Sequence, residues 1–428
     1  MKKSMKKSLT VAISLAIFFL PNLVSAEASV NTNPNERIFF KHPDPQAEFS
    51  AKMQRRSNRA RKKISPDIIE KIKKIEPPNI QNSPEIETPS EFWEMEIAPG
   101  LIEKIYTHSA RGDRVKAYCL IADHDRYELT PMLALGKVQG RATVSDMYRD
   151  FNAWSDNSAV GAINASYFAV TGDLIGVTKI DGLAAGTTYF ERSAIGIMPD
   201  GTAVFGKNYY DGHVTLGNMT LPVSGVNHER SDNNLIIYNR WFGESTRTNE
   251  FGLEFVVENG YVTAINQNNS RIPADGIVVS VHGTAKDAFM NVKIGDRAII
   301  SEDFGNPWND AIHIVGAGPR LVSSGMVYVT ADEEEFPSDI QIGRAPRSAV
   351  GVTSDGDFLI AVVDGRQSLS RGCTLTEWAQ LLIDFGAVDA INLDGGGSSA
   401  LVINGELMNS PSDGSERPVG SSIIISRK

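Results

Sequence analysis

The sequence has little cysteine and little histidine. Two cysteines, Cys119 and Cys373, and seven histidines stand in 428 residues, and their spacing does not match a Cys–His zinc site. Cys119 lies in an apolar run that predicts a position inside a buried strand. Because buried free thiols are common, we expect two free cysteines rather than a disulfide, although export would permit one.

Long hydrophobic runs are also scarce, which excludes a chain built from membrane-spanning helices. The one apolar run of note covers residues 9–20, after four lysines and before Val24-Ser25-Ala26. This pattern is typical of a secretory signal peptide over residues 1–26, and twelve apolar residues are short for a membrane span. We therefore expect an exported protein, periplasmic or extracellular, with an uncleaved anchor as the alternative.

Positive charge is deficient over most of the chain. The formal net charge is −10, and residues 75–428 carry 26 basic and 46 acidic side chains. An acidic body argues against nucleic acid as a partner. Residues 51–74 depart from this trend, with ten basic and two acidic side chains. We interpret them as a solvated helix or linker, with weak contact to an anionic surface as the alternative.

Three regions follow from composition and periodicity. After the signal peptide, residues 27–92 form an N-terminal extension with a basic, helically spaced segment and a proline-rich linker. Residues 93–428 alternate short β-branched runs with glycine and asparagine turns. We predict one α+β or mixed α/β domain there, with mixed sheets, β-hairpins and helix crossovers.

Two sequence echoes suggest related half-units within this domain. Residues 192–196 and 347–351 share an Arg-Ser-Ala start and are each followed by Asp-Gly at the same spacing, which predicts two hairpins. Thr143 and Thr374 each precede an acidic residue by three positions, a capping-box pattern that opens a helix leading to a strand. Glu377 is therefore interpreted as a helix cap rather than a catalytic acid.

The segment from residue 358 to residue 393 predicts a strand, a helix and a second strand. Phe358 to Val363 is continuously apolar, as in a strand buried on both faces, and the second strand covers residues 388–393. Strands joined by a helix crossover run parallel. If both share a sheet, Asp364 and Asp394 lie at the same carboxyl edge, where open α/β sheets bind ligands.

Three consecutive glycines follow Asp394. Gly395, Gly396 and Gly397 can take positive φ and expose backbone N–H groups that bind an anionic oxygen, and Ser398 and Ser399 add hydroxyl donors. The run is not a nucleotide P-loop, because no Gly-Lys-Ser/Thr follows and the next element, residues 400–403, reads as a strand. A tight turn between strands is the structural alternative.

Other side chains are candidates for the same site. Arg347 and Arg366 suit phosphate oxygens, because a planar guanidinium binds them in pairs. Asn392 precedes Asp394, and Asn164 ends the corresponding strand of the first echo. No cofactor is indicated with confidence; Ca²⁺ at the acidic run 332–335 is the one alternative to a solvated loop there.

Several motifs together resemble a known family. In order they are Asn164-x-x-Tyr167-Phe168, Gly316-x-Gly318-Pro319-Arg320-Leu321-Val322, Arg347-x-Ala349-Val350-Gly351, Asp364-Gly365-Arg366 and Asn392-Leu393-Asp394-Gly395-Gly396-Gly397-Ser398-Ser399. They resemble the phosphodiester glycosidase domain, named for the enzyme that removes N-acetylglucosamine from phosphodiester-linked mannose 6-phosphate; bacterial members are described as exopolysaccharide-related. Ala165 departs from the family pattern, where glycine is expected.

The resemblance implies hydrolysis of a sugar-1-phosphodiester in envelope or exopolysaccharide glycan metabolism. Asp394 or Asp364 would act as base or nucleophile, and Arg347 and Arg366 would hold the phosphate. The glycine backbone and Ser398 would position oxygens, and Asn164 and Asn392 would bind sugar hydroxyls or orient an acid. The alternatives are a non-catalytic glycan-binding module and a structural envelope protein that acts through residues 51–74.

Overall fold

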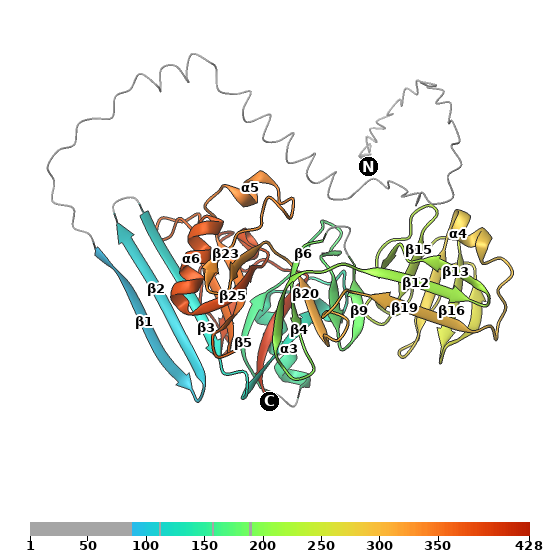
Figure 1. The fold of residues 1–428 in the computed structure, drawn as a ribbon, viewed down its shortest axis with the longest axis horizontal. Coiled ribbons are helices and arrows are strands. Elements are labelled where there is room, and N and C mark those ends of the chain that lie inside the picture. Colours follow the sequence, from blue (N-terminus) through green and yellow to red (C-terminus); the bar gives the residue numbers. More distant parts are fainter. Residues whose placement is uncertain (1–87, 111–112, 156–157, 188–190) are drawn as a thin grey trace, which may run out of the picture. The chain divides into compact units, whose positions relative to one another are not determined.

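The computed structural model describes residues 88–428 apart from 111–112, 156–157 and 188–190 (Figure 1). The predicted signal peptide and the basic segment 51–74 lie outside these residues. The first strand begins at Thr88, inside the segment that composition assigns to the linker. No helix in the described part of the chain has the length and apolarity needed to cross a membrane.

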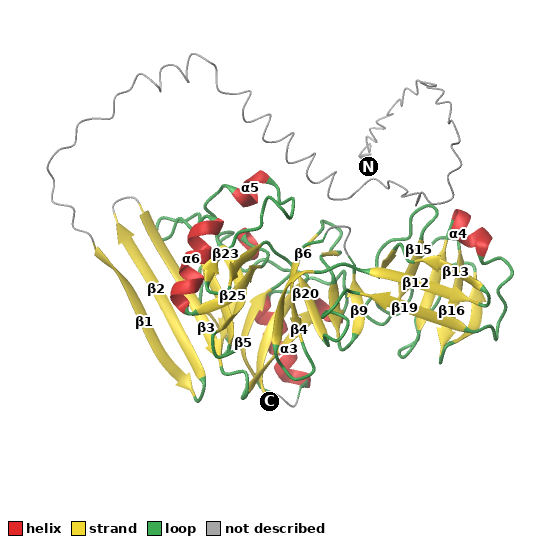
Figure 2. Cartoon of the chain, viewed as in Figure 1, coloured by secondary structure: helices red, strands yellow, loops and turns green. Residues whose placement is uncertain are grey.

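The predicted fold class is wrong, because the regular secondary structure of the described residues is mostly β-strand (Figure 2). Strands are numbered up to β28, whereas the described α-helices are α3 (Val144–Trp154), α4 (Gly283–Ala288), α5 (Ser338–Gln341) and α6 (Leu375–Phe385). Both central sheets are antiparallel between all neighbouring strands. Strand–helix–strand segments occur, but they are few, and their strands pair with antiparallel neighbours.

Two central sheets form the main body. The eight-stranded sheet has the order β1 (Thr88–Ala98), β2 (Leu101–Ala110), β3 (Asp113–Ala122), β24 (Phe358–Val363), β23 (Arg347–Thr353), β25 (Ala387–Asn392), β21 (Arg320–Ser323) and β22 (Met326–Val327). The five-stranded sheet has the order β27 (Glu406–Leu407), β26 (Leu401–Ile403), β5 (Ala159–Asn164), β28 (Ser421–Arg427) and β4 (Tyr127–Leu133).

These sheets pack face to face, and a helix covers each outer face. Leu120 and Ile360 of the larger sheet share a core cluster with Ile163 and Ile423 of the smaller one. On the outer face of the larger sheet, α6 buries Trp378 and its apolar neighbours. On the outer face of the smaller sheet, α3 buries Met147 and Phe151. The layers are therefore helix, sheet, sheet, helix, as expected when each sheet must bury both faces.

The apolar run of β24 shows why this arrangement follows from the sequence. Alternate side chains of a strand point to opposite faces. Phe358, Ile360 and Val362 enter the core between the sheets, whereas Leu359, Ala361 and Val363 pack under α6. The prediction that this strand is buried on both faces is confirmed.

The remaining strands form smaller sheets around another core (Figure 1). They are β11 (Ala203–Lys207), β10 (Ser193–Ile197), β20 (His313–Gly316), β8 (Thr178–Ile180) and β9 (Leu183–Gly186); β13 (Met219–Pro222), β12 (Asp211–Leu216) and β19 (Ala298–Asp303); β14 (Gly225–Val226), β15 (Leu235–Tyr238), β18 (Ile277–Val281), β16 (Leu253–Glu258) and β17 (Tyr261–Asn266); and the pair β6 (Tyr167–Phe168) and β7 (Leu174–Ile175). The pair β14–β15 is parallel.

Both sequence echoes correspond to real elements. The Arg-Ser-Ala segments form the antiparallel hairpins β10–β11 and β23–β24. Thr143 and Thr374 cap α3 and α6, and the capping box of Thr374 with Glu377 is complete. Gly386 ends α6 with a left-handed φ of 113°, which glycine adopts without a steric penalty. The echoed elements lie in different sheets, with antiparallel neighbours throughout.

The two cysteines are free and buried, as expected. Cys119 and Cys373 both belong to the core between the eight-stranded sheet and α6. Burial raises the pKa of the Cys373 thiol to about 12, so it stays protonated and unreactive at neutral pH.

Candidate functional site

One edge of the eight-stranded sheet gathers most of the predicted site residues. Strands β24 and β25 both pair antiparallel with β23, which lies between them. They therefore run parallel to each other, and the residues that follow them, Asp364 and Asp394, lie at the same edge. Arg347 begins β23 at this edge, because it pairs with Val363. The crossover through α6 thus produces the juxtaposition predicted from sequence.

Two of the three glycines have separate structural reasons. Gly396 alone takes a positive φ, 66°, and its N–H donates to the carbonyl oxygen of Pro346 at 2.9 Å. A Cβ on Gly397 would lie 2.0 Å from Nη2 of Arg417, so only glycine permits that approach. Gly396–Ser398 form a 3-10 turn. The run is a tight turn shaped for close contacts, not a series of positive-φ residues.

Asp394 is a carboxyl group under strong desolvation. Burial raises its pKa to about 6, and this rise is opposed by a hydrogen bond from Ser398 and by the nearby charge of Arg417. A carboxyl with this pKa is largely ionised at neutral pH and still accepts a proton readily. These are the properties of a general base or a nucleophile.

Two buried asparagines hold the loop that carries Asp394. Asn164 donates to the carbonyl oxygen of Asp394 at 2.5 Å and accepts from the Ser348 hydroxyl at 2.7 Å. Asn392 donates to the hydroxyl of Tyr167 at 2.9 Å. Both asparagines are fully buried. Their contacts therefore orient the acid from the two facing sheets, and their amide donors point to protein groups.

Asp364 is more enclosed than Asp394. It is 4% exposed, and its Oδ1 accepts the N–H of Ser410 at 2.8 Å. Burial raises the pKa of Asp364 to about 6, against hydrogen bonds from Ser410 and Asn409. The side chain thus ties the edge of the sheet to the segment after β27. That segment leads to Asp413 and Arg417.

Arg347 reaches the edge but is mostly committed to protein carbonyls. Its Nε donates to Cys373 O at 3.1 Å, and its Nη2 donates to Ile340 O at 3.0 Å and Gly343 O at 2.6 Å. Three of its five N–H groups are therefore used, and only 3% of the residue is exposed. Arg347 fixes the loop around α5, and its predicted role in phosphate binding stays a prediction.

Two other guanidinium groups lie against the glycine turn. Nη1 and Nη2 of Arg366 are each 3.2 Å from the position of a Cβ on Gly396, and the Arg366 side chain has no ion pair among the described residues. Arg417 contacts Gly397, pairs with Asp413 at 2.6 Å and donates to the Ser398 hydroxyl at 3.4 Å. Arg366 is exposed and holds a left-handed φ of 61°.

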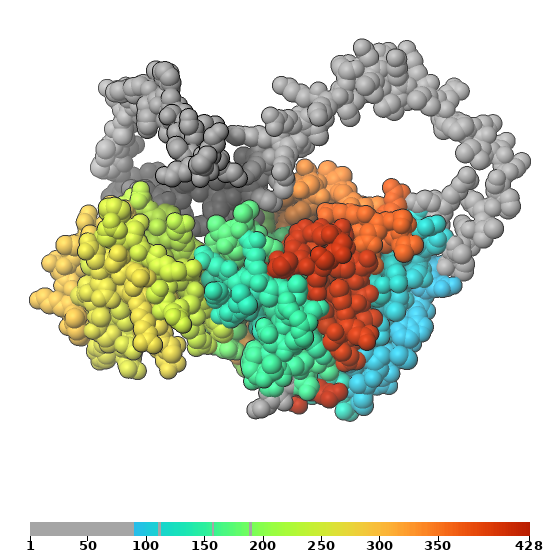
Figure 3. Space-filling model, turned by 180° about the vertical axis from the view of Figure 1, so that it is seen from behind, coloured from blue at the N-terminus to red at the C-terminus, as the bar shows by residue number. Residues whose placement is uncertain are grey.

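Sequence reasoning missed Arg417, Asp413 and Asn409. They lie in the turn-rich segment between β27 and β28, where no periodicity marks a site. In Figure 3 the red C-terminal part of the chain reaches the surface beside the orange part. A signal was present in the printed sequence: an Asp and an Arg four residues apart in a Ser- and Gly-rich loop near the chain's last strand. That pattern alone does not indicate which carboxyl it serves.

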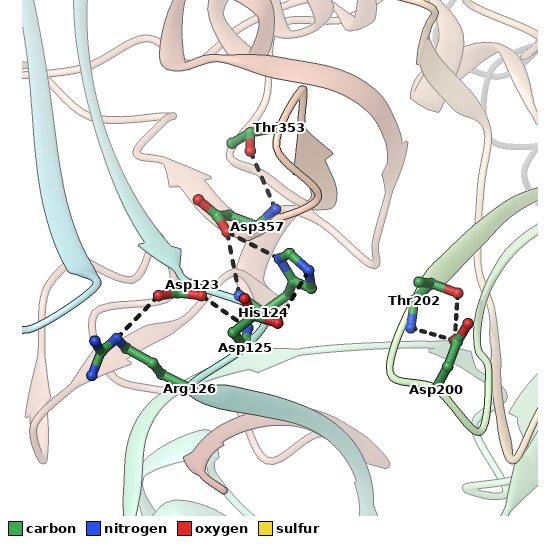
Figure 4. A network of polar contacts seen from close by, with 8 residues as sticks. All are labelled: Asp123, His124, Asp125, Arg126, Asp200, Thr202, Thr353 and Asp357. Atoms are coloured by element: carbon green, nitrogen blue, oxygen red, sulfur yellow. Dashed lines mark hydrogen bonds and ion pairs between the residues drawn. The ribbon is translucent and has the colours of Figure 1, made fainter.

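The opposite end of the same strands carries another acidic group of residues (Figure 4). Asp123, His124 and Asp357 each offer a ligand atom within 4.8 Å of the others. Their charges already have protein partners: Nδ1 of His124 lies 3.3 Å from Asp357 and Nε of Arg126 lies 3.2 Å from Asp123.

The acidic run 332–335, where Ca²⁺ was the alternative, is divided between surface and core. Glu334 is 2% exposed, and its carboxylate accepts the Ser193 N–H at 2.8 Å and the Arg320 N–H at 3.1 Å. Its three acidic neighbours are exposed. Glu334 therefore has a structural role beside the cis peptide of Pro319.

The fold and the site together define a class of protein. It has a double antiparallel sheet, with a desolvated carboxyl, a glycine turn and arginines at one edge. Residues 251–426 match the model of the phosphodiester glycosidase family. The matched segment includes both acids, all three site arginines and the glycine turn.

Relatives agree over shorter stretches. The mouse N-acetylglucosamine-1-phosphodiester alpha-N-acetylglucosaminidase is 31% identical over 157 residues, which are 33% of this chain and 30% of the enzyme. An uncharacterized SPbeta prophage-derived protein of Bacillus subtilis, YomE, is 33% identical over 129 residues, 29% of this chain and 20% of that protein. The chain thus spans less than a third of the length of these relatives.

Solved structures extend the likeness of the fold. A hypothetical protein from Synechocystis superposes with a TM-score of 0.68 at 25% identity, covering 80% of this chain and 64% of that one. A Burkholderia pseudomallei protein described as exported gives a TM-score of 0.60 at 22% identity, covering 74% and 75%. The second of these supports the fold alone.

Proposed function

We propose that this protein is a hydrolase that cleaves a sugar-1-phosphodiester, in envelope or exopolysaccharide glycan metabolism. The observation that carries the proposal is the convergence on one glycine turn of a carboxyl with a pKa of about 6 and the Arg366 and Arg417 guanidinium groups. The mouse relative is named for cleavage of an N-acetylglucosamine-1-phosphodiester, which supports the same class of substrate.

The reaction requires little proton donation. Water adds to the anomeric carbon, the bond between that carbon and the phosphate oxygen breaks, and the phosphate monoester leaves with the bonding electrons. That leaving group is already a stable anion, so one carboxylate with cationic help replaces the usual pair of carboxyls. Asp394 either accepts the proton of the attacking water or attacks the anomeric carbon itself; both roles need its ionised form.

The two arginines supply the cationic help. Arg366 makes no protein ion pair among the residues described, and Arg417 uses about three of its five N–H groups on Asp413 and Ser398. Their remaining donors suit two phosphate oxygens, because guanidinium groups bind oxyanions in pairs. Asp364 acts at a distance, by holding the segment that leads to Arg417.

Export is part of the proposal. It rests on the pattern of residues 1–26, in which lysines, an apolar run and small residues follow one another. N-terminal sequencing of the protein recovered from the cell envelope or the medium tests it. A mature chain beginning at Glu27 is expected, whereas an intact Met1 on a cytoplasmic protein would contradict it.

The test of the activity compares two carboxyl-to-amide variants of the same sheet. Purified protein is assayed on a panel of sugar-1-phosphodiesters, with the released sugar and phosphate monoester identified. Asp394→Asn should lower kcat by about 10² to 10⁴ through loss of the base. Asp355→Asn is the matched control, because Asp355 is exposed in the turn at the other end of β23.

The outcomes separate the candidate functions. Turnover that survives in a folded Asp394→Asn protein would refute the assignment of the carboxyl. Saturable binding of a glycan by wild-type protein with no product released would favour the non-catalytic binding module. Circular dichroism and the thermal midpoint establish that each variant is folded.

A further inference from the structure

A cavity of about 320 Å³ lies away from the sheet edge described above. Its walls come from the loops 227–234 and 239–252, which follow β14 and β15 of one five-stranded sheet. Tyr238 at the end of β15 and Gln139 ahead of α3 complete the lining. The volume is at the lower end of the ~300–1,000 Å³ typical of small-molecule sites, so it suits one sugar-sized ligand. None of the residues proposed for hydrolysis lines it.

A buried arginine is fixed at the wall of this cavity. Arg230 is 8% exposed; its Nη1 donates to the Ser280 hydroxyl at 2.8 Å and its Nη2 to the side chain of Asn249 at 2.8 Å. A Cβ on Gly252 would lie 1.9 Å from Nη1, so the guanidinium rests directly on that backbone. Nε and part of Nη1 have no protein acceptor among the described residues, which leaves them for a ligand.

The arginine belongs to a preformed network. Glu254 is fully buried and accepts from the Ser280 hydroxyl at 2.9 Å and the Thr248 hydroxyl at 2.7 Å. It also accepts from the Thr246 hydroxyl at 3.1 Å. A buried carboxylate with this many donors is fully hydrogen-bonded, so the network is rigid. It fixes both the position of Arg230 and the path of the loop through 246–249.

That loop presents a second guanidinium. Arg247 has a left-handed φ of 51°, an uncommon conformation for a residue other than glycine, asparagine or aspartate. Its guanidinium lies 4.5 Å from the centre of the Phe242 ring and donates to Gln139 Oε1 at 2.8 Å. The strained backbone therefore directs an exposed, oriented cation toward the cavity. Strain held by a buried network is characteristic of binding sites.

From this geometry we propose that the cavity is a second site, which binds an oxyanion-bearing monosaccharide unit. Arg230 and Arg247 offer paired donors to a carboxylate or a phosphate, since planar guanidinium groups match both. Gln139, Glu229 and Asn249 offer hydrogen bonds to hydroxyl groups. A neutral sugar would leave the exposed Arg247 guanidinium without an oxyanion, and a bare anion would leave the hydroxyl partners unused.

The site is independent of the hydrolase proposal. The probes are glucuronate, glucose 6-phosphate, neutral glucose and inorganic phosphate, each titrated into the full chain by calorimetry. Glucuronate and glucose 6-phosphate distinguish a carboxylate from a phosphate as the preferred oxyanion. We expect saturable binding of at least one of them, at least about tenfold tighter than that of glucose or of inorganic phosphate.

Matched arginine variants identify the location. Arg247→Ala should weaken binding at least about tenfold. Arg240→Ala is the control, because Arg240 is also a loop arginine stacked on an aromatic ring, 4.8 Å from the centre of Trp241, but does not line the cavity. Arg247→Lys keeps the charge without the planar fork, and should lose affinity by a smaller factor. It also serves if the alanine variant does not fold.

Several results would overturn the proposal. These are absence of saturable binding of either oxyanion sugar, equal affinity for glucose, and equal affinity for inorganic phosphate. Equal loss in Arg240→Ala and Arg247→Ala would place the binding elsewhere. Because Arg247 takes no part in the proposed hydrolysis, the Arg247 variants should keep any phosphodiesterase turnover of short substrates, whatever the binding result.

Discussion

The two ends of the β23–β24 hairpin both carry aspartates, yet they differ in chemistry. At one end Asp364 and Asp394 are desolvated, and the pKa of each is raised to about 6. At the other end Asp357 and Asp123 are half-exposed and lie beside His124 and Arg126. Figure 4 shows how the charges of the second group point toward one another.

We propose that the raised pKa of its carboxyls, and not the number of acids, distinguishes the reactive end. A carboxyl in water beside a cation gains little from its surroundings and has nothing to drive proton transfer. Desolvation raises the free energy of an ionised carboxyl, and arginine donors that are free to bind a substrate lie close to this one. A charged reaction partner changes that free energy, so the carboxyl can respond to the reaction. The absence of a side chain at Gly397 lets Arg417 approach the turn that follows Asp394.

The largest expected difference between the ends concerns their Arg–Asp pairs. Arg417→Ala removes a guanidinium that we propose binds the phosphate, so kcat/KM should fall by about 10² to 10³. Arg126→Ala removes a similar pair from the other end, because Arg126 lies 3.2 Å from Asp123. It should leave kcat/KM within about twofold of wild type, since an exposed ion pair contributes little. Steady-state kinetics on the best phosphodiester measures both.

Gly397→Ala provides a check on the mechanism of that loss. Its Cβ would meet Nη2 of Arg417, so the variant should behave like Arg417→Ala, and the double variant should be no worse than either single one. Additive losses would mean that the glycine and the arginine act separately. A large loss in Arg126→Ala would remove the contrast between the ends.

The pH dependence of turnover is the next largest effect. If ionised Asp394 is required, kcat/KM should be level above pH 6 and fall about tenfold per pH unit well below it. The same acidic limb should persist in Asp364→Asn, because Asp364 is assigned to positioning. Loss of the limb in Asp364→Asn would instead give Asp364 the chemical role.

Much of the local structure could be predicted from the sequence. The helix 375–385, its capping box and its terminal glycine follow from local chemistry. The continuous apolar run 358–363 is typical of a strand that is buried on both faces. The fold class could not be obtained in this way. Hairpin signals specify antiparallel neighbours locally, but which strand lies between β24 and β25 depends on long-range packing, which no spacing reveals.

Site residues at the ends of strands could be predicted from the sequence, whereas those that reach the site from a loop could not. Asp364 and Asp394 follow the ends of strands and Arg347 begins one, so strand pairing brings all three to one edge of the sheet. Arg417 reaches the turn from a segment without periodicity, and only the three-dimensional approach to Gly397 identifies it. The engagement of Arg347 by three carbonyl oxygens was equally invisible, because backbone acceptors leave no mark in a sequence.

The smallest expected effect concerns stability and separates the two ends without any substrate. Asp364 has a folded-state pKa of about 6, above its ordinary value of 3.8, so the folded protein holds this proton more tightly than the unfolded chain. The cost of the ionised form is therefore complete above pH 6 and is relieved as the pH falls toward 4. Asp364→Asn has no such cost. Between pH 7 and pH 4, wild type should gain roughly 1 to 3 kcal/mol of unfolding free energy relative to that variant.

Urea denaturation at each pH measures this difference, with Asp357→Asn as the partner from the other end. Asp357 is half-exposed and contacts His124 at 3.3 Å, so its replacement should cost under about 1 kcal/mol at pH 7. A stability difference between wild type and Asp364→Asn that stays constant from pH 7 to pH 4 would show that Asp364 is not desolvated. The contrast between the two ends would then rest on Asp394 and on the placement of the arginines.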